Sequence, residues 1–196
     1  MIDKCIINPI HSNSIFVLRD ILSKEFLPIV KEGRQLIIVC IGSDRSTGDS
    51  LGPLVGENLK FLSRDNLTLY GNLENPVHAK NISSVLLEIQ KTYVNPYIIA
   101  VDACLGSLQN VGNIIVENIP LCPGAALKKD LPKVGNLSIT GVVNISGSME
   151  FMVLQNTRLY TVMQLANTIS KGLYHSIIKT FGGDKNSYRK NLLESI

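Results

Sequence analysis

The sequence predicts an α/β fold in which helices cover both faces of a mostly parallel central sheet, a three-layer α/β/α sandwich. Residues 35–41 and 96–102 are continuous apolar runs, which are typical of strands buried on both faces. Segments with the apolar spacing of helices separate the strands, and strands joined in this way pair in parallel through right-handed crossovers. The chain has 196 residues, 45% of them hydrophobic, so we expect a single domain over residues 1–196 with one sizeable core.

Helical and extended patterns alternate along the chain in the order that this fold needs. Apolar residues recur at helical spacing from Ile15 to Ile29, which predicts an N-terminal helix over residues 13–32, ahead of a core over residues 35–181. Late in the core, two strands follow each other without a helix between them, so we expect one of them to run antiparallel. A tail over residues 184–196 is expected after Gly182 and Gly183. The other predicted elements are strands at 35–41, 67–71, 96–102, 112–119 and 137–145, and helices at 51–62, 79–91 and 159–181.

Composition argues against several classes of partner. The net charge is only +3, and no run of Lys and Arg exceeds two residues, so we expect no nucleic-acid binding and no membrane binding. No segment approaches the roughly 18 apolar residues that span a bilayer. The start of the chain, MIDKCIINPI, lacks a long apolar core followed by a cleavage site, so a cytoplasmic location is expected.

The cysteines indicate free thiols in a reducing compartment. They lie far apart, without a C-x-x-C pair, and Cys40 falls inside a predicted strand. We therefore expect buried free thiols and no cysteine-bound zinc. The four are Cys5, Cys40, Cys104 and Cys122.

Polar residues follow three of the predicted strands, at the edge of the sheet where functional groups gather in such folds. Asp102 comes directly after a buried strand, where a carboxylate is costly unless it is hydrogen-bonded, metal-bound or protonated. Because adjacent strand ends lie about 5 Å apart, side chains from neighbouring loops are expected to meet there. The polar residues of this edge are Asp44, Asp49, Glu74, His78 and Asp102.

Several chemistries remain open at this edge. Two facing carboxylates can share a proton and activate water for attack on a peptide carbonyl, and with His78 they could hold a divalent metal. Asp49 could instead cap the helix that contains Pro53, and Asp102 could simply order a turn. A nucleophilic pair of Cys104 and His78 lacks an orienting third group. The glycines between Gly42 and Gly52 match neither common phosphate-binding pattern.

Four ordered motifs carry a resemblance to a known family. From about Gln35 to Phe181 the chain resembles the YyaC-type sporulation proteins, in the stretches CIGSDRSTGDSLGPLVG, AVDACLG, LPKVGNLSITGVVNISG and MEFMVLQNTRL. That family resembles the spore germination protease and, more distantly, the hydrogenase-maturation proteases. The resemblance implies the three-layer fold, a spore-forming Gram-positive source, and a location in the mother cell or forespore.

The resemblance also assigns roles to individual residues. DSLGP and AVDACLG match the segments that hold the two essential aspartates of the germination protease, which implies that Asp49 and Asp102 are catalytic. It thus implies an aspartate-dependent endopeptidase that acts on spore or sporulation proteins, and a homo-oligomer is a further expectation. The loop 43–50 would supply backbone donors to the substrate, and residues 121–135 would form a lid. The supporting residues are expected to be Gly42, Ser43, Asp44, Gly48, Gly52, His78 and Gly124.

Two other functions stay open at this point. One is a catalytically inactive, protease-like protein that binds a protein or peptide partner during sporulation. The other is a metal-dependent hydrolase that uses Asp49, Asp102 and His78. None of the three histidines matches the later histidine of the hydrogenase-maturation proteases, so we expect no nickel site. For the endopeptidase itself we expect no metal and no cofactor.

Overall fold

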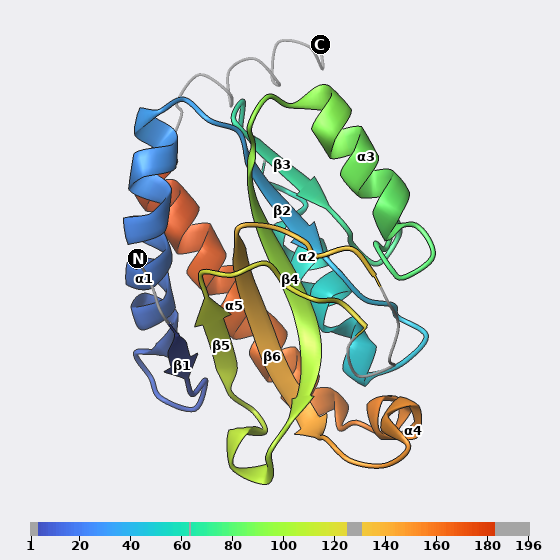
Figure 1. Cartoon of the computed structure of the whole chain (residues 1–196). Helices are drawn as coiled ribbons and strands as arrows, with labels where there is room; N and C mark the ends of the chain where they lie inside the picture. The colour runs from blue at the N-terminus through green and yellow to red at the C-terminus, as the bar shows by residue number, and fades with distance from the viewer. Residues whose placement is uncertain (1–3, 63, 125–130, 183–196) are drawn as a thin grey trace, which may run out of the picture.

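The computed structural model describes residues 4–62, 64–124 and 131–182, and it contains a six-stranded sheet in the order β1-β5-β6-β4-β2-β3 (Figure 1). The strands are β1 (Cys5–Ile7), β2 (Leu36–Cys40), β3 (Leu67–Tyr70), β4 (Tyr97–Gly106), β5 (Ile114–Glu117) and β6 (Leu137–Ile145). The α-helices are α1 (Ser14–Lys31), α2 (Leu51–Leu59), α3 (Ile82–Thr92), α4 (Glu150–Gln155) and α5 (Leu159–Phe181). Short 3₁₀ helices lie at η1 (Gly48–Ser50) and η2 (Leu108–Asn110).

The strand directions match the predicted, mostly parallel sheet. β2 pairs in parallel with β3 and β4, and β4 pairs in parallel with β6. β5 runs antiparallel to β6, as expected for two strands without a helix between them. The edge strand β1, which pairs antiparallel with β5, was not predicted, because three residues are too few to show a period.

Helices cover both faces of the sheet, but unequally. α1, α2 and α5 pack on one face, where Leu18, Val55 and Leu165 belong to one large hydrophobic core. α3 and the chain around Leu121 and Val134 cover the other face and form a smaller core. Alternate residues of β2 belong to the two cores, which explains why that strand is apolar at every position. The predicted α/β fold with a covered central sheet is therefore confirmed.

Element boundaries differ from the predictions at two places that matter for the site. β4 does not end at Asp102 but continues to Gly106, because it stays paired with β6 through an irregularity between Cys104 and Leu105. The helix α4 was not predicted, since six residues carry no usable periodicity. It begins after Met149, whose φ is 60°.

The predictions for the two ends of the chain have different outcomes. The helix expected over residues 13–32 is confirmed as α1, and α5 ends at Phe181, directly before Gly182. The predicted tail over residues 184–196 lies outside the described residues. Within the described residues, no helix is both long enough and apolar enough to cross a membrane.

All four cysteines are free, as expected, but they are not all buried. Cys40 lies in the core and Cys122 is exposed, while Cys5 and Cys104 are half-buried. The expectation of buried thiols is thus wrong for Cys122, because this residue lies in the connection between β5 and β6 rather than in a strand.

Candidate active site

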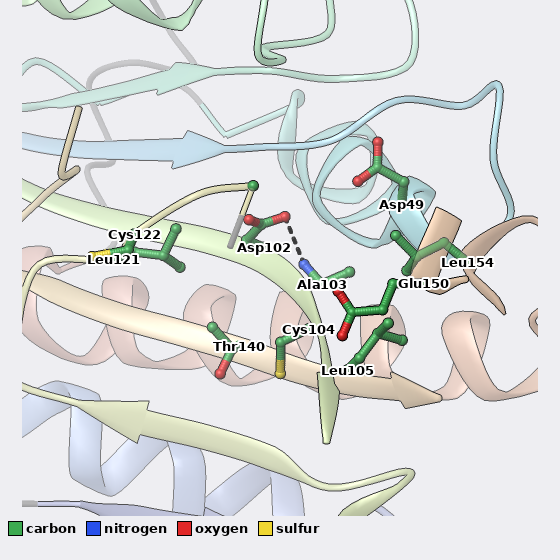
Figure 2. Close-up of a pocket in the computed structure, with 11 residues that line it drawn as sticks. Asp49, Asp102, Ala103, Cys104, Leu105, Leu121, Cys122, Thr140, Glu150 and Leu154 are labelled. Atoms are coloured by element: carbon green, nitrogen blue, oxygen red, sulfur yellow. Dashed lines mark hydrogen bonds between the residues drawn. The ribbon is translucent and has the colours of Figure 1, made fainter. Parts of the chain in front are cut away.

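A cavity of about 320 Å³ lies at the carboxyl-terminal part of β4, between that strand and the segments η1 and α4 (Figure 2). Three carboxylates line it, each from a different element: Asp49, Asp102 and Glu150. Its other polar walls include Cys104 and Thr140. The cavity therefore lies at the sheet edge that the sequence predicts to be functional.

Asp102 is the most buried of these acids. It follows Val101, whose side chain belongs to the large core, so the alternation of the strand directs Asp102 to the opposite face, into the cavity. Its exposed fraction is 8%, and its Oδ1 accepts a hydrogen bond of 2.8 Å from the backbone N–H of Ala103. Burial, and then the charge of Asp49, raise the pKa of Asp102 well above its usual range, while the Ala103 bond opposes them. The site therefore favours a protonated Asp102.

Asp49 reaches the same cavity from a loop that folds back over the end of β2. Gly42, with φ 142°, donates its N–H to the carbonyl of Val77 at 2.8 Å, and Ser43 donates its N–H to the carbonyl of Asp49 at 3.0 Å. A Cβ on Gly42 would lie 2.0 Å from the Asp49 carbonyl oxygen, and a Cβ on Gly52 would lie 2.0 Å from the carbonyl oxygen of Ile41. Glycine is therefore required at both positions for the loop to place Asp49.

The interpretation of Asp49 as a helix cap does not match its position. Thr47 is the N-cap residue of η1 and Ser50 that of α2, whereas Asp49 lies within the first turn of η1. Asp49 is half-buried, and its charge raises the pKa of Asp102. The structure thus brings together the two acids that the sequence singles out.

Glu150 is the lining residue that the sequence analysis missed. Figure 2 shows its side chain extending from α4 toward Ala103 and Leu105 of β4. The segment that carries it is fastened by Asn144 of β6, whose side-chain Nδ2 donates to the carbonyl of Val153 at 3.3 Å and to the Thr157 hydroxyl at 3.2 Å. The motif MEFMVLQNTRL contains Glu150, but no strand end lies beside this residue in the sequence to mark it.

Three of the five polar residues predicted to meet at this edge do not line the cavity. Asp44 and Glu74 are exposed. His78 is half-buried near the start of α3, where its backbone N–H donates to Asn81 Oδ1 at 2.8 Å, and its Nδ1 is buried without a hydrogen-bond partner among the described residues. Of the five polar residues expected at this edge, the cavity is therefore lined by Asp49 and Asp102, and the other three lie outside it.

The other supporting residues hold the backbone in place or line the cavity. Gly48 packs against α4, since a Cβ there would lie 2.9 Å from Leu154 Cδ2 and from Thr157 Oγ1. Gly124 lines the cavity together with Leu121 and Cys122. These three belong to the predicted lid over residues 121–135, of which residues 125–130 lie outside the described residues.

The described residues also bear on the metal and thiol alternatives. Within them, no group of three or more His, Cys, Asp or Glu side chains is arranged to hold a metal ion, so Asp49, Asp102 and His78 do not form such a group. Burial raises the pKa of the Cys104 thiol to about 11, which keeps it protonated near neutral pH. Since His78 does not line the cavity, the proposed pair of Cys104 and His78 has no geometric support.

Comparisons with known proteins agree with the fold and identify the family. The chain is 53% identical over 141 residues to "Uncharacterized protein YyaC" of Bacillus subtilis strain 168, covering 72% of this chain and 69% of that protein. Its fold is similar to the crystal structure of the NiFe hydrogenase maturation protease HycI from Thermococcus kodakarensis KOD1, with a TM-score of 0.51 and 16% identity, over 81% of this chain and 99% of HycI. The sequence pattern of the family described as a protein of unknown function, DUF1256, matches residues 6–172, and the chain belongs to that family.

Proposed function

We propose that the protein is an aspartate-dependent endopeptidase in which Asp49 and Asp102 activate a water molecule. The observation that carries the proposal is that Asp49 and Asp102 line one cavity, where burial and the charge of Asp49 raise the pKa of Asp102. Two carboxyl groups with different proton affinities are the arrangement that divides acid and base roles between them. The fold shared with a hydrogenase maturation protease agrees with this activity.

The more exposed Asp49 acts as the base in this mechanism. It accepts a proton from the water as the water oxygen attacks the carbonyl carbon of the peptide bond. Asp102 donates its proton to the amide nitrogen, and the C–N bond breaks to release an amine and a carboxylic acid. Proton transfer from Asp49 back to Asp102 through a further water restores the starting state.

Spore or sporulation proteins in the cytoplasm of the mother cell or forespore are the substrates that we propose. The resemblance of four motifs to the YyaC-type sporulation proteins supports this assignment, together with the 53% identity to a Bacillus subtilis protein. A protein substrate also agrees with the cavity, which opens beside a strand of the sheet rather than inside a closed core.

The test is incubation of the purified protein with a spore-protein extract, followed by mass spectrometry of new N-termini. We expect new termini with the wild type and none with Asp102→Asn or Asp49→Asn. The amide introduced by Asp102→Asn keeps an oxygen that can accept the Ala103 N–H, so that variant should fold, and thermal melting checks this. Asp44→Asn is the matched control, an exposed acid of the same loop outside the cavity, and it should cleave like the wild type. Equal cleavage patterns for the wild type and the folded Asp102→Asn variant would contradict the proposal.

A binding function without catalysis is the second candidate, and one contact favours it. The Asp102 carboxylate already satisfies the backbone N–H of Ala103, so its role could be to hold the end of the sheet together. In that case Asp102→Ala, which removes the acceptor of the Ala103 N–H, lowers the melting temperature, whereas Asp102→Asn leaves partner binding intact. A folded, stable Asp102→Asn protein that has lost only cleavage would exclude this candidate.

A further inference from the structure

One long edge of β4 has no strand partner beside the candidate active site. β2 pairs with β4 from Leu36–Tyr97 to Cys40–Val101 and then ends, whereas β4 continues to Gly106. Over residues 102–106 the strand partner of β4 within the described residues is β6 alone, on the other side. Figure 1 shows β4 and β6 extending together past the end of β2. From Asp102 onward, the side of β4 that faced β2 therefore has no strand partner within the described residues.

The chain after β2 is held away from this edge. Ile41 still donates its N–H to the carbonyl of Val101 at 2.7 Å, but Gly42 donates to Val77, on the side of β3. The loop then returns as η1 and places Asp49 across the gap. The resulting space is bounded by the edge of β4 on one side and by η1 and α4 on the other.

The cavity lies over the face of the sheet that carries Asp102, Cys104 and Thr140, and it extends to this edge of β4. Four consecutive residues of β4 line it, Asp102 to Leu105. Side chains of consecutive strand residues point to opposite faces, and those of Ala103 and Leu105 pack toward the large core. Because Ala103, Leu105 and Asp49 of η1 also line the cavity, it reaches the unpaired edge of β4 as well as the face of the strand.

We propose that an extended segment of the polypeptide substrate docks in this cavity as an added strand on the edge of β4, in the position that β2 leaves open. The identity of the occupant rests on the proposed endopeptidase function. An extended backbone is the ligand that offers hydrogen-bonding groups at the spacing of a strand edge. The 320 Å³ of the cavity falls at the lower end of the range of ligand sites, enough for a short stretch of chain.

The backbone of Ala103 is the first docking point. The carbonyl of Val101 points toward β2, and the backbone groups of Ala103, two residues further on, point in the same direction past the end of β2. The N–H of Ala103 is now bonded to Oδ1 of Asp102. A substrate carbonyl that takes over this N–H releases the Asp102 oxygen and places the peptide bond next to both acids. Docking thereby prepares Asp102 for its role as the acid.

Backbone pairing is tested with peptides that lack single N–H groups. Asp49→Asn protein, used to prevent cleavage, selects binders from a displayed library of random linear peptides, and the best binder is synthesised with one N-methyl amide at a time. Methylation should weaken binding about fivefold or more at alternate positions and leave the positions between them unchanged, because each added-strand hydrogen bond contributes about 1 kcal/mol. Equal effects at all positions, or no binder at all, overturn the proposal.

Hydrogen exchange of backbone amides locates the peptide. We expect the bound peptide to slow the exchange of the amides of Ala103 and Leu105. Exchange in β3 should not change, and β3 is the matched control because it is an outer strand that pairs with β2. Slowed exchange at β3 instead of β4 overturns the proposal. So does protection of β4 that appears without peptide and rises with protein concentration, because it would show self-association at this edge. Peptide binding does not require cleavage, so the two proposals can fail separately. Absence of protease activity would contradict the proposed function. Equal effects of methylation at all positions, in a protein that is an active protease, would contradict only the docking mode.

Discussion

Two segments bring a carboxylate to the cavity, and they do so in different ways. The loop from Gly42 to Gly52 brings Asp49 and is fixed by its own backbone, through glycines that allow contacts no other residue permits. The segment 149–157 brings Glu150 and is fixed by side chains, with Asn144 and Thr157 bonded to each other and to the carbonyl of Val153. The Asp49 loop is held by close backbone contacts that tolerate no side chain at its glycines. The position of segment 149–157 depends instead on side-chain hydrogen bonds, which a substitution can remove without a steric clash. The two should therefore respond differently to mutation.

The largest expected effect is on the Asp49 loop. Gly42→Ala places a Cβ 2.0 Å from the Asp49 carbonyl oxygen at a φ of 142°, so backbone must move to relieve both the clash and the strain. We expect a loss of about 3 kcal/mol or more in the free energy of unfolding, measured by urea denaturation. Gly147→Ala is the matched control on the α4 side, since nothing lies within 4 Å of its Cβ position, and it should change stability little. Similar losses for the two variants would contradict the contrast between the segments.

The second effect concerns Asp102, which shares the cavity with both segments. The pKa of Asp102 in the folded protein lies above its value of about 3.9 in the unfolded chain. At any pH between these two pKa values, the protein therefore takes up a proton when it folds. The stability that protonated Asp102 contributes is fully present below about pH 4. It is lost progressively as the pH rises from there to the pKa of Asp102 in the folded protein. Relative to Asp102→Asn, the wild type should lose at most about 1.4 kcal/mol per pH unit in that window.

Urea denaturation of both proteins at a series of pH values checks this slope. Cleavage should fall as pH rises through the pKa of Asp102 in the folded state, because the acid then loses its proton. A difference in the free energy of unfolding between wild type and Asp102→Asn that stays constant with pH would show that the cavity does not favour the protonated carboxyl.

The third effect is on the α4 segment. Thr157→Val keeps the shape of the side chain but removes the hydroxyl that donates to the Val153 carbonyl at 2.8 Å and accepts from Asn144 Nδ2 at 3.2 Å. A loss of about 1–2 kcal/mol is expected in urea denaturation, since the half-buried amide of Asn144 and the Val153 carbonyl each lose a hydrogen-bond partner. Thr92→Val, an exposed position at the end of α3, is the control and should be close to neutral. An unchanged stability for Thr157→Val would mean that packing of Leu154, not these bonds, holds α4.

The same contrast explains what the sequence could predict. Asp49 and Asp102 were found because each follows a buried strand, Asp102 directly and Asp49 after a short loop, so a local pattern together with the rule for parallel sheets is enough to place them. Glu150 reaches the cavity only through a short helix whose position depends on Asn144 and Thr157, and no local pattern records that packing. His78 follows a strand region as Asp49 does, yet its backbone begins the turn into α3, and this turn takes it away from β4.

The continuation of β4 beyond Asp102 was missed for a related physical reason. The strand prediction stopped where the apolar run stopped, but residues 102–106 remain extended because they pair with β6, a strand more than 30 residues away in sequence. Pairing between distant segments overrides local pattern here. The open edge that this produces could not be derived without knowing where β2 ends.

The smallest effect tests whether Glu150 is more than a wall of the cavity. It is half-buried, lines the cavity and, among the described residues, forms no ion pair, so its charge is available to a ligand. We compare Asp49→Asn protein with Asp49→Asn protein that also carries Glu150→Gln. Peptides with a lysine that faces this position should bind the second protein about two- to fivefold more weakly than the first, because they lose a solvent-accessible ion pair. The same peptides with norleucine in place of lysine should bind both proteins equally, and Glu74→Gln, at an exposed acid outside the cavity, should change neither. Fluorescence anisotropy of labelled peptides measures these constants. Equal weakening for lysine and norleucine would mean that Glu150 acts through shape, and the α4 segment would then differ from the Asp49 loop in function as well as in the way it is held.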